Sequence, residues 1–123
     1  MPENNNFYIA LDGDKIIATA AIRAYDVDYD LFRGVYSGDD TASIWRLMVD
    51  EDYRRHGIAR KLVNVMESFA ENAGYGQIYL HTHRYLESGL PFWKSLGYEI
   101  TIEEDDYDET THMVKKLGLP LKK

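Results

Sequence analysis

A strongly amphipathic segment in the middle of the chain does most to limit the folds open to this sequence. Its apolar side chains recur at spacings of three and four residues, which is the period of one helix face. They are Ile58, Leu62, Met66, Phe69 and Ala73, with Val65 beside them. Gly74 is a natural stop, because glycine readily adopts the left-handed conformation that ends many helices. We therefore expect a long helix from about residue 58 to residue 73.

Two predicted strands flank this helix. Residues 42–49 (Ala-Ser-Ile-Trp-Arg-Leu-Met-Val) carry apolar side chains at both alternations, which predicts a central strand covered on both faces. Residues 77–83 alternate instead, with Ile78, Leu80 and Thr82 on one face. A strand, a helix and a strand of these lengths predict two parallel strands joined by a right-handed crossover.

The remaining segments complete an α/β pattern with a mixed sheet. Strands at residues 7–11 and 15–25 surround Asp12-Gly13-Asp14, which is a strong hairpin signal. Residues 26–42 have no regular period and predict a loop. Further expected elements are a short helix at residues 88–96, with Ser88 as a candidate N-cap, and strands at residues 98–103 and 111–117.

Length and composition exclude several function classes. With 123 residues, 45% of them hydrophobic, the chain has room for one domain, residues 1–123. The absence of cysteine excludes a disulfide scaffold, a thiolate zinc site and a cysteine nucleophile, and no metal is expected. No apolar run approaches the roughly 20 residues that span a bilayer, and the first residues lack signal-peptide character. We therefore expect a cytoplasmic protein.

The charge of the chain is unevenly distributed. The formal net charge of −7 argues against nucleic acid or an anionic membrane as a partner. Residues 1–52 sum to −7 and residues 99–123 to −3, whereas residues 53–98 sum to +3. The basic middle of an acidic chain requires an explanation.

The turn before the long helix suits an anion. Arg54-Arg55-His56-Gly57-Ile58-Ala59 follows a strand, and the backbone N–H groups at a helix start carry partial positive charge. Gly57 permits a tight bend or the close approach of a ligand, and Arg60 and Lys61 add two further cations. These features predict a pyrophosphate site, although neither a P-loop nor a dinucleotide fingerprint is present. The alternative is a basic first turn on a surface helix.

These residues resemble the signature of the GNAT superfamily of acyl-CoA-dependent N-acyltransferases. That signature is Arg/Gln-x-x-Gly-x-Gly/Ala after a central strand, and here Leu47-Met48-Val49 precedes Arg54-x-x-Gly57-x-Ala59. A second family pattern, an aromatic pair before Lys-x-Leu-Gly-Phe, stands as Phe92-Trp93-Lys94-Ser95-Leu96-Gly97-Tyr98. The resemblance covers about residues 7–117. It implies an α/β fold with a mixed, mostly antiparallel central sheet, a splayed parallel strand pair and flanking helices.

The resemblance also implies a function. Members use acetyl-CoA as co-substrate, and an amine, either a small molecule or a peptide, attacks the thioester directly. The pyrophosphate would lie on the backbone of Arg55, His56, Gly57, Ile58, Ala59 and Arg60, with Arg54 nearby. The pantetheine would pair with the backbone of Leu47, Met48 and Val49.

The chain departs from the family at three places. The usual general acid is a tyrosine where this chain has Trp93, and an indole N–H cannot protonate a leaving thiolate. Trp93 is therefore expected to pack against the pantetheine or in the core. The family also has an asparagine seven residues before this tyrosine position, and this chain has Leu86 there. The family normally begins with a strand and two helices, whereas this sequence starts at the hairpin.

Candidate catalytic residues therefore have to be sought elsewhere. His81, His83 and Tyr85 lie at or after the end of strand 77–83, which is the acceptor side in this family. Histidine, with a pKa near 6.5, suits the deprotonation of an ammonium group. The alternative is that these are ordinary residues of a strand surface.

Three further alternatives stay open. The hairpin strand at residues 7–11 leaves an open sheet edge, so the chain forms either a homodimer that covers this edge or a monomer. The run at residues 103–109 contains six acids and is either a solvated loop or a surface that attracts a cationic acceptor. A non-catalytic acyl-CoA-binding regulatory module would use the same anion-binding turn as an enzyme.

Overall fold

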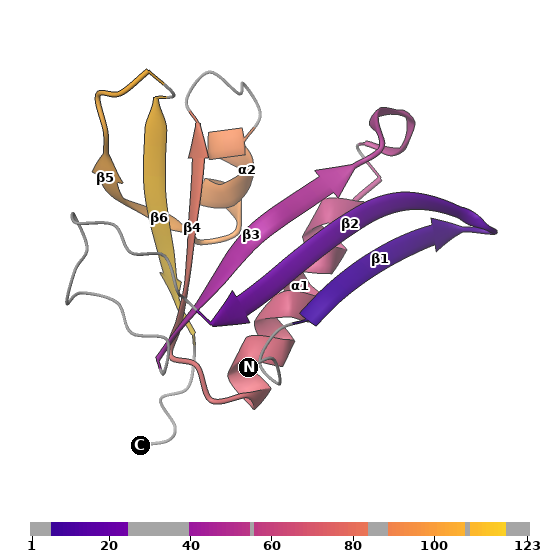
Figure 1. The fold of residues 1–123 in the computed structure, drawn as a ribbon, viewed down its shortest axis with the longest axis horizontal. Helices are drawn as coiled ribbons and strands as arrows, with labels where there is room; N and C mark the ends of the chain where they lie inside the picture. The colour runs from indigo at the N-terminus through magenta and orange to yellow at the C-terminus, as the bar shows by residue number, and fades with distance from the viewer. Residues whose placement is uncertain (1–5, 25–39, 55, 84–88, 108, 118–123) are drawn as a thin grey trace.

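The strands form a six-stranded sheet, and α1 and α2 lie on one of its faces (Figure 1). This computed structural model describes residues 6–24, 40–54, 56–83, 89–107 and 109–117. The elements in chain order are β1 (Asn6–Asp12), β2 (Lys15–Ala24), β3 (Thr41–Val49), a 3-10 turn (Glu51–Tyr53), α1 (Ile58–Asn72), β4 (Gln77–His83), α2 (Gly89–Ser95), β5 (Glu99–Glu103) and β6 (Thr110–Lys116).

The sheet order is β1-β2-β3-β4-β6-β5, and of these neighbours only β3 and β4 run parallel. This topology confirms the predicted α/β fold with a mixed, mostly antiparallel sheet. It also confirms the predicted parallel pair, because the chain runs from β3 through α1 into β4. In the described part of the chain, no helix is long and apolar enough to cross a membrane.

The N-terminal hairpin forms as predicted. Asp12 pairs with Lys15, and Gly13 between them has a φ of 64°, in the left-handed region that favours glycine. Strand β1 pairs with β2 on one side and is an edge of the sheet within the described residues. The loop predicted after this hairpin lies outside the described residues as far as residue 39.

Helix α1 occupies the predicted segment, but its buried face is shifted. The buried residues are Leu62, Val63, Met66 and Ala70, whereas Val65 is 45% exposed. The expectation for Val65 is therefore wrong. The sheet contacts the arc of the helix centred between Leu62 and Val63, and at about 100° per residue Val65 falls on the flank of that arc.

The C-terminus of α1 confirms the stop signal at Gly74. This glycine has a φ of 93°, and its N–H donates to the carbonyl of Glu71 at 3.1 Å. The N–H of Tyr75 reaches back to the carbonyl of Ala70 at 3.0 Å. This pair of bonds is the Schellman arrangement, which satisfies carbonyl groups that the helix end would otherwise leave unpaired.

A β-bulge at Trp45 changes which side chains of β3 reach the core. The pairing with β2 gains one residue in β3 between Ile44 and Arg46, and an extra residue in one strand reverses the alternation of the faces beyond it. Leu47 therefore packs against the same core as Ile44.

The bulge also corrects the expectation that both faces of β3 are covered. Trp45 is 43% exposed and Met48 is 61% exposed, so the second half of β3 is open on one face. The apolar pattern of this segment did not predict the bulge. Without the bulge, Leu47 and Val49 would point away from the core.

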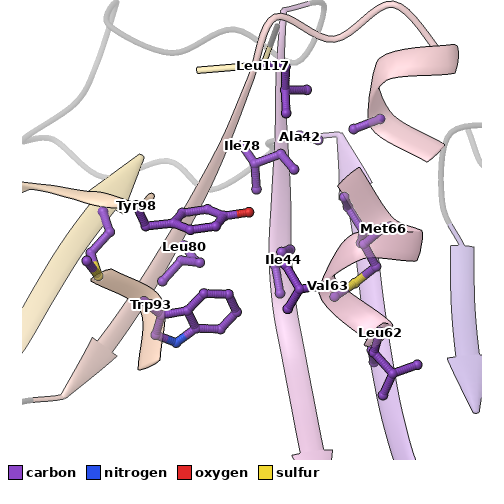
Figure 2. Close-up of a cluster of buried hydrophobic side chains, with 14 of the residues drawn as sticks. Ala42, Ile44, Leu62, Val63, Met66, Ile78, Leu80, Trp93, Tyr98 and Leu117 are labelled. Atoms are coloured by element: carbon purple, nitrogen blue, oxygen red, sulfur yellow. The ribbon is translucent and has the colours of Figure 1, made fainter. Parts of the chain in front are cut away.

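The core lies between the sheet and both helices. Figure 2 shows Trp93 of α2 and Tyr98 beside β4, across from Val63 and Met66 of α1, with Ile44 of β3 between them. All five side chains are at most 8% exposed. This core fixes both helices against the parallel strand pair, which is where the candidate site lies.

Candidate functional site

The parallel strands β3 and β4 separate partway along their length. Their pairing runs from Thr41–Gln77 to Ser43–Tyr79, although both strands continue for several more residues. Beyond that point β3 pairs with β2 and β4 with β6, within the described residues. Figure 1 shows the two strands diverging, with α2 beside the end of β4. The splayed pair is thus confirmed, and the backbone edge of β3 in this opening can pair with an extended ligand, as an added strand would.

The beginning of α1 presents backbone donors beside the C-terminal end of β3 (Figure 1). Gly57 precedes the helix with a φ of 78°, and no side chain among the described residues caps this end. The N–H of Lys61 donates to the carbonyl of Gly57 at 3.1 Å, so the N–H groups of residues 58–60 have no acceptor within the helix. A Cβ built on Gly57 would meet nothing within 4 Å. The space beside Gly57 at this helix start is therefore open, which fits the close approach of an anion.

Cationic side chains surround this helix start. Arg54, Arg60 and Lys61 are exposed, as is His56. The Nη2 atom of Arg60 lies 3.5 Å from the hydroxyl of Ser95 at the end of α2, which brings its charge towards the opening. With the helix dipole, these side chains produce a positive potential that favours a phosphate group. Arg55, predicted for the same site, lies outside the described residues.

The strand and helix residues predicted for the coenzyme take two different positions. Leu47, Met48 and Val49 all lie beyond the last β3–β4 pair and so border the opening. Trp93 is 8% exposed, and the centroid of its ring is 5.1 Å from that of Tyr98. The expectation that Trp93 packs in the core is confirmed, while its contact with pantetheine stays a prediction.

The candidate catalytic histidines lie on the face of β4 that points away from the helices, because Ile78 and Leu80, at the alternate positions, are in the core. His81 is exposed and His83 is half-buried, with ring centroids 5.7 Å apart. Tyr85, the third candidate, lies outside the described residues, as do Leu86 and Ser88.

The neighbours of His81 lower the pKa of its imidazole below the usual 6.5. The groups packed around the partly exposed ring remove water from it, and this desolvation has the largest effect. The imidazoles of His112 and His83 act in the same direction, while the carboxylate of Glu104 opposes them. A lowered pKa keeps His81 neutral near pH 7, the state in which it accepts a proton.

A buried histidine next to this site was not among the residues predicted from the sequence. His112 of β6 lies directly opposite His81 and is 0% exposed. Its Nδ1 atom is 2.7 Å from the Tyr79 hydroxyl, and its Nε2 atom is 2.6 Å from Oε2 of Glu104. The strand containing His112 was predicted, but the pattern of one strand does not tell which strand it pairs with or in which register.

Some of the acids in residues 103–109 make contacts within the protein, although Asp106, one of these acids, is itself exposed. Asp106 accepts hydrogen bonds from the backbone N–H and from the hydroxyl of Thr110, both at 2.9 Å, and Glu104 contacts His112. Glu103 and Asp105 are exposed. The exposed acids are available to attract a cation, and that role stays a prediction.

A hollow of about 410 Å³ lies elsewhere, beside β5 and β6, and is lined by residues that include Gln77, Glu99 and Lys115. It shares no lining residue with the opening or with the histidines. The site described above therefore depends on strand edges, a helix start and side-chain chemistry rather than on this hollow.

Sequence comparison identifies relatives of this chain. The model of the Acetyltransferase (GNAT) family matches residues 1–98. Human N-acetyltransferase 8B is 30% identical over 95 residues, which are 77% of this chain and 39% of that protein. Probable N-acetyltransferase 14 of Danio rerio is 34% identical over 97 residues, 74% of this chain and 35% of that protein. The chain thus spans less than half the length of these relatives.

Structural comparison agrees at the level of the fold. A GNAT family acetyltransferase from Elizabethkingia anophelis, solved with acetyl-CoA bound, superimposes with a TM-score of 0.73 over 94% of this chain and 78% of that chain, at 18% sequence identity. The family match includes the anion-binding turn, both parallel strands and the Leu-Gly-Tyr segment. The chain therefore belongs to the GNAT acetyltransferase family.

Proposed function

We propose that this chain is an N-acetyltransferase that transfers an acetyl group from acetyl-CoA to a primary amine. The observation that carries the proposal is that β3 and β4 separate beside a basic helix start with no side-chain cap among the described residues. Family membership supports the activity, and the Elizabethkingia relative holds acetyl-CoA.

Each part of the coenzyme has a matching feature of the protein. The backbone N–H groups at the start of α1 would hold the pyrophosphate, and Arg54 and Arg60 would add positive charge. The edge of β3 at Leu47–Val49 would hold the pantetheine, because its amide groups can exchange hydrogen bonds with an extended backbone. Bound in this way, acetyl-CoA supplies the thioester carbon that the amine attacks.

The chemistry at the opening is a direct transfer. His81 takes one proton from the ammonium form of the acceptor and leaves a nucleophilic amine. The C–N bond to the acetyl carbon then forms, the C–S bond breaks, and the second amine proton neutralises the coenzyme thiolate. His83 lies beside this base, and Tyr85 remains a predicted contributor.

We further propose a cationic acceptor, either a small-molecule or a peptide amine. Glu103 and Asp105 leave exposed negative charge at the end of β5. Strand β5 pairs with β6, and β6 pairs with β4, the strand that carries His81 and His83. Such charge raises the local concentration of a cation and speeds its association.

A non-catalytic acyl-CoA-binding regulatory module is the second candidate. This second function is favoured by Trp93, which is buried at the position where the family usually has a tyrosine that acts as general acid. A thiol-release assay with a panel of amines separates the two functions, with calorimetry used to measure binding of acetyl-CoA. Release of coenzyme thiol that requires an amine supports the enzyme. Binding of acetyl-CoA without turnover of any amine would support the module, and absence of binding would reject both.

We also propose that a second copy of the chain pairs with the edge of β1. Phe7, Ile9 and Leu11 are 59%, 47% and 56% exposed, and they lie on one face of an edge strand. An exposed apolar edge of this kind is prone to association.

A further inference from the structure

The two ring nitrogens of His112 have different partners, and these partners define its tautomer. An ionised carboxylate only accepts hydrogen bonds, so Nε2 of His112 carries the hydrogen that it shares with Glu104. The Tyr79 hydroxyl can then donate to Nδ1. The result is a chain of two hydrogen bonds, from Tyr79 through His112 to Glu104.

This chain of hydrogen bonds joins three separate elements and reaches from the interior to the surface. Tyr79 is on β4 and is 1% exposed, His112 is on β6 and is 0% exposed, and Glu104 follows β5 with 35% of its side chain exposed. The rings of Tyr79 and His112 stack with centroids 5.8 Å apart and an interplanar angle of 24°. Burial of this kind holds the hydrogen-bonded side chains in one arrangement.

The chain of hydrogen bonds also lies next to the opening. Tyr79 belongs to the last residue pair that joins β3 to β4, and His81 follows two residues later on the same face of β4. The ring centroid of His81 is 6.4 Å from that of Tyr79 and 6.2 Å from that of His112. His81 therefore has the buried pair as its neighbours where the strands begin to separate.

We propose that Tyr79, His112 and Glu104 form a relay that positions His81 beside the opening and sets the charge that His81 meets when it takes up a proton. This inference rests on the proposed function, in which His81 accepts the proton of the amine. In the relay His112 and Tyr79 are positioning residues, because they are buried and act through His81.

The charges around His81 determine the sign of the effect. Among the described residues, His83 of β4, His112 of β6 and Glu104 after β5 are the titratable groups that act on it. Glu104 favours the protonated form of His81, whereas the two imidazoles and the desolvation of the ring disfavour it. Removal of the Glu104 charge should therefore lower the pKa of His81 further.

The test is a pH titration of His81 in the full chain, in which the NMR signals of the imidazole groups report the midpoint. The chain has four histidines, and the signal missing from His81→Gln assigns His81. Glu104→Gln keeps an oxygen that can accept from His112 but removes the charge, so we expect the His81 midpoint to fall by roughly 0.5 pH unit. The acidic limb of the kcat/KM profile should move by the same amount.

A second variant tests the buried end of the relay. Tyr79→Phe keeps the ring but removes the hydroxyl that donates to Nδ1 of His112, so the His112 ring signals and the His81 midpoint should both change. Tyr107→Phe is the matched control, because Tyr107 is 99% exposed, and it should leave both unchanged.

The outcomes separate the relay from the proposed function. If Glu104→Gln and Tyr79→Phe fold and leave the His81 midpoint where Tyr107→Phe leaves it, the relay is overturned. The pH profile of kcat/KM also tests whether Tyr79 and Glu104 only stabilise the fold. In that case the two variants would lower the plateau of the profile without moving its acidic limb. If the midpoint moves as expected but His81→Gln keeps full activity, the coupling of the relay to His81 stands and the role of His81 as proton acceptor is lost.

Discussion

The hydroxyl of Tyr98 donates a 3.0 Å hydrogen bond to Oε2 of Glu67 and so joins the segment before β5 to α1. The Nζ atom of Lys115 on β6 lies 3.1 Å from both oxygens of the same carboxylate. Burial first, and the negative charge of Glu67 second, raise the pKa of Tyr98 far above its usual value. The hydroxyl therefore stays protonated and remains a donor. Tyrosine at the end of the Leu-Gly-Tyr segment thus has a bonding role that the apolar pattern does not show.

Loss of this hydroxyl should destabilise the fold. Tyr98→Phe keeps the ring in the core but leaves Glu67 without one partner, so the free energy of unfolding should fall by about 2 kcal/mol, as for other hydrogen bonds to charged groups. Urea unfolding measures the change. Tyr107→Phe, at a position that is 99% exposed, is the control, and equal midpoints for the two variants would contradict the role given to the Tyr98 hydroxyl.

The helix start can be tested at Gly57. Alanine there should cost about 1 kcal/mol of stability, because a φ of 78° is strained for alanine and not for glycine. The added Cβ would enter open space, so coenzyme binding should persist. Gly57→Glu has the same backbone strain but adds a negative charge, so affinity for coenzyme A should fall at least roughly tenfold. Calorimetry compares the two variants. If Gly57→Glu binds as Gly57→Ala does, the anion site is placed wrongly.

The lowered pKa of His81 also predicts how stability depends on pH. Between the folded pKa of His81 and 6.5, the unfolded chain binds more protons than the folded chain at this residue. The contribution of His81 to the free energy of unfolding is therefore lost as the pH falls below 6.5. It is recovered as the pH rises through this window. Urea midpoints between pH 5 and 7.5 should vary less in His81→Gln than in the parent. Tyr107→Phe, at a position that is 99% exposed, serves as the comparison and should retain the slope of the parent.

The exposed acids should affect the acceptor rather than the chemical step. The double variant Glu103→Gln and Asp105→Asn should raise the KM of a polyamine by roughly threefold at low salt and leave kcat unchanged. The difference should shrink at high salt, where charges are screened. Glu71→Gln, an exposed acid at the end of α1, is the control. An unchanged KM for the polyamine in the double variant would show that these acids are only solvated.

Self-association of the chain through β1 can be tested by placing a charged side chain on this strand. Ile9→Lys should weaken self-association at micromolar concentration, since a lysine on an edge strand opposes pairing with another strand. Light scattering measures the mass. Val65→Lys introduces the same side chain at an exposed position of α1 and should leave the mass unchanged. A parent chain that is monomeric at these concentrations would remove the proposal.

Much of the architecture followed from local patterns. The helical stripe, Gly74, the hairpin turn at Gly13 and the alternation of β4 each reflect a backbone preference or a periodic face. The anion-binding turn was predictable for the same reason, because a helix start, a glycine and cationic side chains are contiguous in the sequence. Its left-handed Gly57 has the conformation that such a turn requires.

The tertiary structure decided the features that depend on which strands and faces meet. The exposure of Val65 is set by how α1 lies on the sheet, and the bulge at Trp45 by the pairing with β2. The contact between His112 and Glu104 brings together a strand and a loop. The Tyr79 hydroxyl, on another strand and 33 positions from His112 in the sequence, contacts the other ring nitrogen of His112. Residue types and periods describe a single segment, whereas strand register and order arise from burying all the segments together. The positions of Glu104 and His112 beside His81 therefore became visible only in the folded chain.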